Sequence, residues 1–183
     1  KSTVSLSTAY SLAEAGKKVL FIDADLRKSV LTGRYKISGE MKGLIHFLSG
    51  QGDLSEILCK TNEKGLFVIF AGPVPPNPAE LLGSKKFAAL LKEARNIYDY
   101  IIIDTPPLGS VIDSAIVSAV CDAAILVISA NTISYKFARS VKDQLAKTGC
   151  NILGVVLNKV SMKQNKYYGK YYGKYYGHYG SDK

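Results

Sequence analysis

Five short apolar runs without polar alternation constrain the fold of this 183-residue chain more than any other feature. Runs of this kind predict strands covered on both faces, because half-exposed strands alternate polar and apolar residues. The runs cover residues 19–22, 66–70, 100–103, 124–128 and 152–157. Helical patterns lie between them, over residues 3–15, 43–49, 53–60, 84–96, 113–120 and 134–148. Alternating strands and helices predict an α/β fold with a doubly wound, mostly parallel sheet.

The last stretch of the chain differs from the rest in composition. From residue 166 the unit Lys-Tyr-Tyr-Gly occurs three times, and a degenerate His-Tyr-Gly follows. A glycine in each repeat and few aliphatic side chains leave too little apolar surface to offset the entropy lost on ordering. We therefore predict a folded domain over residues 1–162 and a disordered tail over residues 163–183.

Charge and composition limit the partners and the cellular compartment expected for this chain. The net charge is +9, and the tail contributes +4 of it, from five lysines after Met162 against the single Asp182. A basic tail favours anionic lipid, nucleic acid or an acidic protein surface. The body shows no recognisable nucleic-acid module, so we expect no specific nucleic-acid partner. The sequence has no apolar run of about 18 residues, and its three cysteines without metal-ligand spacing fit a reducing cytoplasm.

Two of the predicted strands end in acidic residues. Asp23 and Asp25 follow the first strand, and Asp104 follows the run 100–103. Taken singly, each is explained equally well as a turn residue or a helix cap. The carboxyl ends of parallel strands meet at one edge, where three carboxylates would repel one another without a cation. Magnesium suits such a site, because it takes a few carboxylates together with phosphate oxygens and water.

The chain opens on Lys1-Ser2-Thr3, directly before a predicted helix. This tripeptide is what remains when a phosphate-binding loop is cut before its lysine. In such a loop the lysine reaches the β- and γ-phosphates and the hydroxyl meets magnesium, while backbone amides at the helix N-terminus hold phosphate. The tripeptide alone is no evidence, but one helix and one strand separate it from Asp23, as a β-loop-α-β unit requires.

Together these motifs resemble those of the bacterial tyrosine kinases, over essentially the whole chain. Asp23-Ala-Asp-Leu-Arg27 is similar to their Walker A′ motif, Ile101-Ile-Ile-Asp-Thr-Pro106 to Walker B, and Lys1-Ser2-Thr3 to the end of Walker A. The stretch at 75–82 and the tyrosine cluster add to the resemblance. It implies a P-loop NTPase fold with a deviant, MinD/ParA-like Walker A. The match is nearest to the Gram-positive type of capsule and exopolysaccharide synthesis, in which kinase and membrane activator are separate polypeptides.

The resemblance implies a role for each motif residue, with ATP and Mg²⁺ as cofactors. Lys1 neutralises the transferring phosphate, and Ser2 and Thr3 belong to the nucleotide site, with Ser2 on magnesium. Asp25 and Asp104 hold the metal, directly or through water. Asp23 orients or deprotonates the incoming tyrosine hydroxyl, although which aspartate is the base stays open.

Three further residues carry open alternatives. Asn158 ends the last predicted strand, where related ATPases use an asparagine to read adenine, and a turn or capping role explains it equally well. Arg27 pairs with the acidic cluster or faces a neighbouring subunit. His46 lies on a mostly apolar helical stretch and is interpreted as structural. The proline-rich loop 72–78 leaves a strand end and is a candidate border of the site.

The resemblance also makes the tail a substrate and implies several partners. The tail is expected to be phosphorylated in trans within a homo-oligomer, at Tyr167, Tyr168, Tyr171, Tyr172, Tyr175, Tyr176 and Tyr179. The partners are a transmembrane polysaccharide co-polymerase that activates the kinase and a cognate phosphotyrosine phosphatase. The protein is then cytoplasmic, is recruited to the inner face of the membrane by its activator, and regulates polysaccharide synthesis and export.

Two other functions remain open. One is a MinD/ParA-type ATPase, switched by its nucleotide, whose basic aromatic tail binds membrane or DNA. The other is a scaffold without enzymatic activity that associates through the tail. The glycine-rich half of Walker A and the strand before it do not occur among the 183 residues. We therefore expect the natural protein to continue upstream, and the 183-residue chain alone to bind nucleotide poorly and not to phosphorylate itself.

Overall fold

The computed structural model describes residues 1–34, 42–107 and 112–160, in which strands and helices alternate and confirm the α/β class. The predicted tail, with all seven candidate tyrosines, lies outside these residues. The described strands are β1 Val19–Asp23, β2 Leu58–Lys60, β3 Leu66–Ile69, β4 Tyr100–Asp104, β5 Ala123–Ser129 and β6 Asn151–Asn158. The described helices are α1 Ser2–Glu14, α2 Leu31–Arg34, α3 Leu44–Leu48, α4 Leu54–Ile57, α5 Pro78–Leu82, α6 Lys85–Arg95, α7 Asp113–Ser118 and α8 Tyr135–Ala146.

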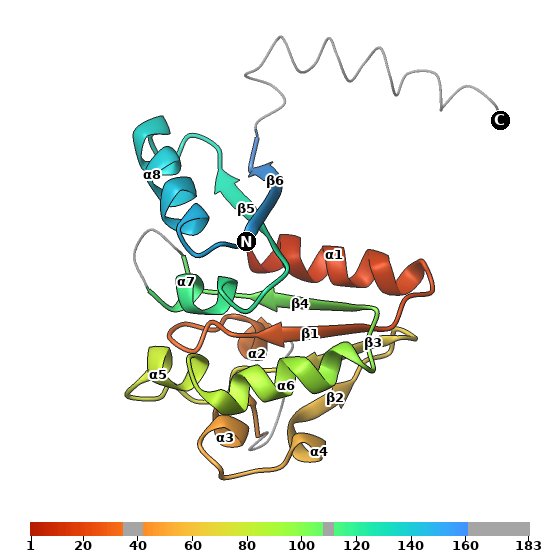
Figure 1. The fold of residues 1–183 in the computed structure, drawn as a ribbon. Helices are drawn as coiled ribbons and strands as arrows, with labels where there is room; N and C mark the ends of the chain where they lie inside the picture. The colour runs from red at the N-terminus through yellow and green to blue at the C-terminus, as the bar shows by residue number, and fades with distance from the viewer. Residues whose placement is uncertain (35–41, 108–111, 161–183) are drawn as a thin grey trace, which may run out of the picture.

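The larger sheet is wound outward from β1 in both directions. Its strand order is β2-β3-β1-β4, and β1 pairs in parallel with β3 on one side and with β4 on the other. The short edge strand β2 runs antiparallel to β3. Figure 1 shows α1 on one face of this sheet and α6, α3 and α4 on the other. The arrangement confirms the doubly wound, mostly parallel topology expected from the sequence.

Strand β1 lies between two hydrophobic cores. All five of its residues are buried, as the absence of polar alternation predicts. Val19 and Phe21 pack in one core with the alanines of α1. Leu20 and Ile22 point to the opposite core, which includes the apolar side of α6. Successive side chains of a strand face opposite ways, so a strand covered on both faces needs an apolar residue at every position.

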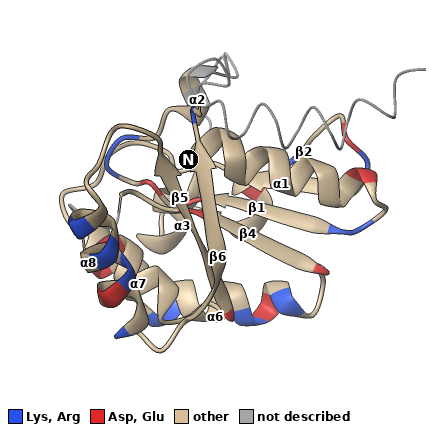
Figure 2. Cartoon of the chain, turned by 90° about the horizontal axis from the view of Figure 1, so that it is seen from above, with Lys and Arg blue, Asp and Glu red and all other residues tan. Residues whose placement is uncertain are grey.

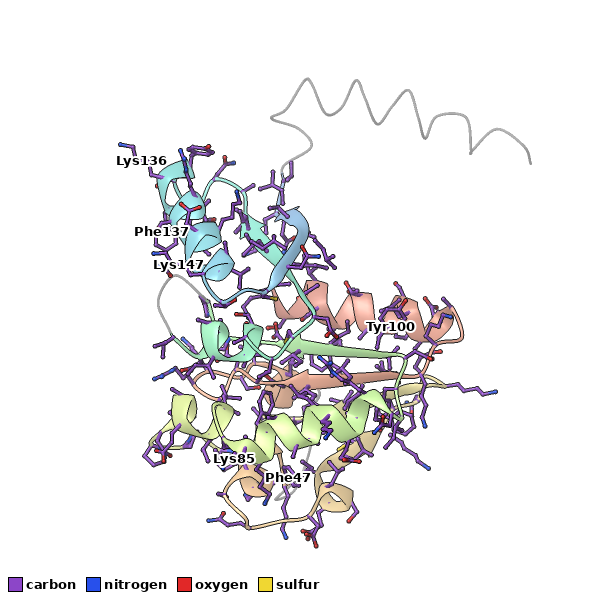
Figure 3. All side chains as sticks on the ribbon, viewed as in Figure 1. Phe47, Lys85, Tyr100, Lys136, Phe137 and Lys147 are labelled. Carbon is purple, nitrogen blue, oxygen red and sulfur yellow. The ribbon has the colours of Figure 1, made fainter. Side chains whose placement is uncertain are left out.

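Strands β5 and β6 form a separate parallel pair and correct the expectation of one sheet. In the described ranges, no strand joins β4 to β5. The residues of β6 alternate between exposed and half-buried, although the run 152–157 predicts cover on both faces. Leu153 is 67% exposed and Val155 57% exposed. Helix α8 packs against this strand on one side, and α7 contacts α8. Figure 3 shows Lys136 and Phe137 on α8 and Lys147 directly after its last residue.

Some local expectations are corrected, and the structural interpretation of His46 agrees with the structure. The predicted helix 53–60 ends at Ile57, because Leu58 adopts an extended conformation and starts β2. The proline-rich stretch leads into α5, which begins at Pro78 and packs against α7. Proline is favoured at the first helical position, where its missing N–H would have no partner in the helix. His46 has a structural contact, since its Nδ1 accepts a hydrogen bond from the Gly43 amide at 3.0 Å.

Charged residues lie mainly outside the sheets. Figure 2 shows them on α6 and α8, while the strands are mostly uncharged. Over the described residues, no helix has the length and apolar character needed to cross a membrane. Cys59, Cys121 and Cys150 form no disulfide in the described structure, where Cys150 is buried and the other two are half-buried.

Candidate active site

The acidic ends of β1 and β4 meet at one edge of the larger sheet. Asp23 and Asp104 are direct neighbours in the parallel register. The amide of Ala24 donates a hydrogen bond of 2.8 Å to the Asp104 carbonyl, which ties the two strand ends together. Both side chains are buried, with 1% of Asp23 and 2% of Asp104 exposed. The structure therefore confirms that these two carboxylates lie side by side.

Lys1 reaches the same edge from the start of α1. Its Nζ lies 3.2 Å from Asp104 Oδ1 and also donates to the Thr105 carbonyl. Lys1 is the N-cap of α1, and Ser2 is the first residue of the helix. The N-terminus of α1, which is the positive end of the helix dipole, therefore lies at the same edge and would favour an anion there. The predicted juxtaposition of Lys1 and Asp104 is present.

The surroundings of Asp23 raise the pKa of its carboxyl group. Burial is the main reason why its pKa rises from 3.8 to about 6, and the nearby charges of Asp104 and Asp25 add to the rise. Hydrogen bonds from the Ser29 hydroxyl to Oδ2 and from the Asp25 amide to Oδ1 oppose it. A carboxyl group that titrates near neutral pH is well suited to accept a proton from a substrate.

Asp25 is placed differently from the other two aspartates. It is half-buried, and its Oδ1 accepts a hydrogen bond of 3.1 Å from the Lys28 amide, within the same loop. No contact between Asp25 and Asp104 is seen among the described residues. The structure therefore shows the turn role for Asp25. Its role on magnesium, together with Ser2 and Asp104, stays a prediction.

One atom of the site suits a metal ion. Asp104 Oδ2 is buried and has no hydrogen-bond partner in the described structure. No group of three His, Cys, Asp or Glu side chains in the described ranges could hold a metal by itself. A single buried carboxylate oxygen fits an ion such as Mg²⁺, which retains water and takes phosphate oxygens as its remaining ligands. The residues therefore fit Mg²⁺ that arrives together with a phosphate group.

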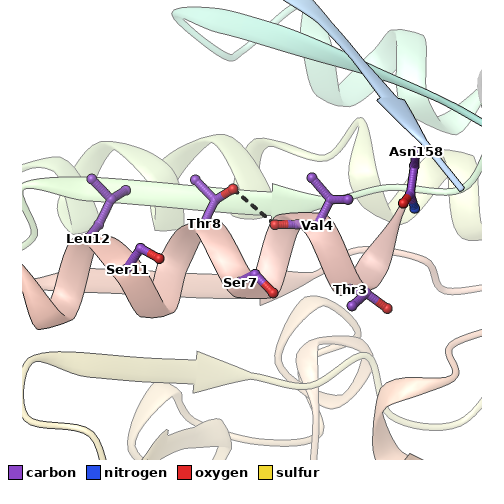
Figure 4. Close-up of a pocket in the computed structure, with 7 residues that line it drawn as sticks. All are labelled: Thr3, Val4, Ser7, Thr8, Ser11, Leu12 and Asn158. Carbon is purple, nitrogen blue, oxygen red and sulfur yellow. Dashed lines mark hydrogen bonds between the residues drawn. The ribbon is translucent and has the colours of Figure 1, made fainter. Parts of the chain in front are cut away.

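A shallow pocket along α1 brings two predicted nucleotide-binding residues together. Its volume is about 490 Å³, and it is lined by Thr3, Val4, Ser7, Thr8, Ser11, Leu12 and Asn158. Figure 4 shows Asn158 at the end of β6, beside Thr3 at the start of the helix. Asn158 also has the turn role considered for it, because its Oδ1 accepts from the Lys159 amide at 2.8 Å and Lys159 has a positive φ of 59°. The two roles of Asn158 are compatible.

Arg27 pairs with a carboxylate that sequence reasoning did not single out. Its Nε donates to Asp113 Oδ2 at 2.7 Å and its Nη2 to Oδ1 at 3.0 Å. Among the described residues, Arg27 therefore forms its ion pair with Asp113 and not with Asp23, Asp25 or Asp104. The only local signal for Asp113 was its place at the start of a predicted helix, where an aspartate is ordinary. Ser29 was also missed, because a serine in a loop carries no pattern of its own.

Comparisons with known proteins agree on a family. A model described as an AAA domain matches residues 1–148. Tyrosine-protein kinase CpsD of Streptococcus agalactiae serotype Ia is 49% identical over 161 residues, which are 88% of this chain and 69% of that protein. The crystal structure of the VpsO kinase domain has a TM-score of 0.82 and 40% identity, over 88% of this chain and 79% of that one. The cell division ATPase MinD of Pyrococcus furiosus has a TM-score of 0.72 and 25% identity, over 90% and 68%.

The kinase relatives match this sequence at higher identity, 49% and 40% against 25%, although the division ATPase covers a similar share of the chain. The match to CpsD covers most of both chains, and the likeness to VpsO extends it to the three-dimensional fold. The chain therefore belongs to the family of bacterial tyrosine-protein kinases.

Proposed function

We propose that this domain transfers the γ-phosphate of ATP to tyrosine hydroxyls, among them those of its own C-terminal tail. The observation that carries the proposal is the pairing of Asp23, a buried carboxyl with a pKa of about 6, with Asp104, whose Oδ1 is bound by Lys1. A proton acceptor, a cation and a carboxylate with a free buried oxygen then lie at one sheet edge. Phosphoryl transfer needs this kind of positioning and charge neutralisation more than covalent participation by the protein.

Each residue would act at a defined atom. The phenol oxygen of the acceptor attacks the γ-phosphorus, its proton passes to the Asp23 carboxylate, and the bond to the β–γ bridging oxygen breaks to release ADP. Lys1 places its ammonium group against the developing negative charge. Asp104 Oδ2 would hold Mg²⁺, together with Ser2 and, through water, Asp25. When bound, that ion neutralises phosphate charge and orients the phosphate oxygens.

The tail is proposed as the substrate because it concentrates acceptors. Seven of the chain's 12 tyrosines lie between residues 167 and 179. About 20 residues of extended chain, at about 3.3–3.6 Å each, could reach the site of a neighbouring subunit. That reach would allow transfer in trans within a homo-oligomer. Each phosphate would add a charge of about −1.5 to −2, so three phosphates would reverse the tail's charge of +4.

The cellular context is proposed from the family. A transmembrane polysaccharide co-polymerase would recruit the kinase from the cytoplasm to the inner face of the membrane and activate it. A cognate phosphotyrosine phosphatase would reset the tail. Capsule or exopolysaccharide synthesis and export would be the process regulated. Membership in the family that includes CpsD supports this context.

The test is phosphopeptide mass spectrometry of the natural full-length protein after incubation with ATP and Mg²⁺. We expect phosphotyrosine between residues 167 and 179, and its loss when all seven tail tyrosines are changed to Phe. The matched control changes the exposed body tyrosines Tyr10, Tyr100 and Tyr135 to Phe and should retain the signal. Phosphate confined to serine, threonine or body tyrosines would overturn the role of the tail.

The second candidate is a nucleotide-switched ATPase of the MinD type. The fold shared with Pyrococcus furiosus MinD favours it. It predicts ATP hydrolysis that anionic vesicles or DNA stimulate, without any phosphotyrosine. The same incubation, followed by a phosphate-release assay, separates the two functions.

A further inference from the structure

The ion pair between Arg27 and Asp113 joins two loops of the candidate site. Arg27 lies two residues beyond Asp25, in the loop that leaves β1. Asp113 is the first residue of α7, on the segment that follows Asp104. Two nitrogens of the guanidinium bind the two oxygens of the carboxylate, at 2.7 and 3.0 Å. The contact therefore connects loops whose carboxylates are proposed to act together.

The pair neutralises a buried charge and also fixes the orientation of the Arg27 side chain relative to Asp113. Asp113 is completely buried, so its carboxylate requires a positive partner. Lysine would also neutralise it, but only the planar guanidinium makes two parallel bonds that fix a direction. The Arg27 side chain is 44% exposed, so its place in the fold is set by this bond more than by burial.

Helix α7 holds both loops through consecutive residues. Asp113 binds Arg27, and the Ser114 hydroxyl donates to the carbonyl of Pro106, two residues beyond Asp104. The helix is itself anchored, because Val117 is 1% exposed within the larger core. The loop of Arg27 also carries Ser29, which donates to Asp23. A shift of Arg27 would therefore be transmitted to Asp23 and Asp25.

We propose that Arg27 and Asp113 form a positioning pair, which holds the loop carrying Asp25 and Ser29 in a fixed place relative to Asp104 during phosphoryl transfer. The inference rests on the roles proposed above for Asp23 and Asp104. Neither member of the pair touches the reacting atoms. The pair acts through the loop, so its loss should affect the transfer step more than the binding of ATP.

The experiment compares Arg27→Gln, Arg27→Lys, Asp113→Asn and the double variant Arg27→Gln/Asp113→Asn in the natural full-length protein. The matched control is Arg95→Gln, which breaks another Arg–Asp pair, at 2.8 Å, whose side chains are 49% and 84% exposed. The readouts are kcat and KM for ATP and the midpoint of thermal unfolding.

We expect Arg27→Gln to lower kcat by about 10- to 100-fold with KM for ATP within about threefold, because misplacing reacting groups by about 1 Å has an effect of that size. Arg27→Lys should lose part of kcat although it keeps the charge. The double variant should regain unfolding midpoint relative to Arg27→Gln, because it no longer buries an unpaired carboxylate, yet it should not regain kcat.

Two results would overturn the positioning role. One is parental kcat in Arg27→Lys and in the double variant, and the other is a loss of kcat that simply follows the loss of folded protein. Asp104→Asn separates this inference from the proposed function. If Asp104→Asn is inactive while Arg27→Gln keeps parental kcat, only the positioning role of Arg27 and Asp113 is overturned, and the proposed function stands. Full activity of Asp104→Asn would overturn the proposed roles and this inference together.

Discussion

Strands β1 and β6 are both apolar and both end next to predicted functional residues, but they are buried to different degrees. Every residue of β1 is buried, whereas every second residue of β6 is exposed. Helices pack on both faces of β1, and α8 packs on one side of β6. The difference teaches that an apolar run predicts a strand, while the neighbouring elements decide how much of it is covered.

The same difference separates the two strand ends chemically. Asp23 and Asp104 lie on the covered sheet, where burial raises the pKa of Asp23 to about 6. Asn158 ends the open strand and lines a shallow pocket. Proton transfer and charge neutralisation suit the buried edge, and recognition of a neutral base suits the open one.

The largest effect should come from truncating the covered core. Phe21 is fully buried, so Phe21→Ala should lower the free energy of unfolding by about 3–5 kcal/mol. Leu153→Ala, at a position 67% exposed, should change it by less than about 0.5 kcal/mol. Urea denaturation measures both. Similar losses at the two positions would mean that the exposed face of β6 is covered in solution.

A second comparison concerns the strand ends. Asp104→Asn in the natural full-length protein should lower kcat for tyrosine phosphorylation by about 10²- to 10³-fold, since it removes a buried negative charge next to Lys1. Asn158→Ala should leave kcat unchanged and raise KM for ATP by less than about tenfold. Initial rates over a range of ATP concentrations distinguish the two. A fall in kcat for Asn158→Ala would contradict a purely nucleotide-binding role.

Stability and activity should also depend on pH through Asp23 at the buried edge, whereas Asn158 at the end of the open strand does not titrate. The pKa of Asp23 is raised in the folded state to about 6, so this carboxyl stabilises the fold below pH 4 relative to higher pH. That contribution, up to about 3 kcal/mol, is lost as the pH rises from about 4 to 6. Activity should change in the opposite direction and rise through about pH 6, as the carboxylate forms.

Unfolding curves and rates measured between pH 4 and 8 check these signs. Asp23→Asn should flatten the pH dependence of stability. Ser29→Ala should move the activity profile upward, because the Ser29 hydrogen bond lowers the pKa of Asp23. A profile centred near pH 4 in the parental protein would contradict the buried state of Asp23.

The smallest effect compares two helix caps. The Ser84 hydroxyl caps α6 by accepting from the Phe87 amide at 3.2 Å, and Ser134 caps α8 by accepting from Phe137 at 3.3 Å. Ser84→Ala should lower the free energy of unfolding by about 1 kcal/mol. Ser134→Ala should act mainly on local opening of α8, which buries only Leu145 among its residues. Hydrogen exchange of the two helices measures both, and equal global losses would contradict the contrast.

Much of the fold was predictable because its signals are local. The five apolar runs all became strands, and the six helical patterns all contain helices. The exceptions were short. Helices α2 and α5 and strand β2 carry too few residues for a period to show, and β2 is set by pairing with β3 rather than by its own pattern. The break between the two sheets could not be predicted, since pairing of strands distant in sequence leaves no local trace.

By itself, the sequence determined the α/β class, the acidic ends of two strands and the likeness to bacterial tyrosine kinases, because periodicity and motif spacing are properties of neighbouring residues. Only the tertiary structure decided that Asp23 and Asp104 share a register, that Asp104 keeps one buried oxygen free of partners in the described structure, and that Arg27 binds Asp113. Arg27 and Asp113 are 86 residues apart in sequence. Burial, pKa and such pairings depend on which distant segments the packed helices bring together, and that information lies in the three-dimensional contacts.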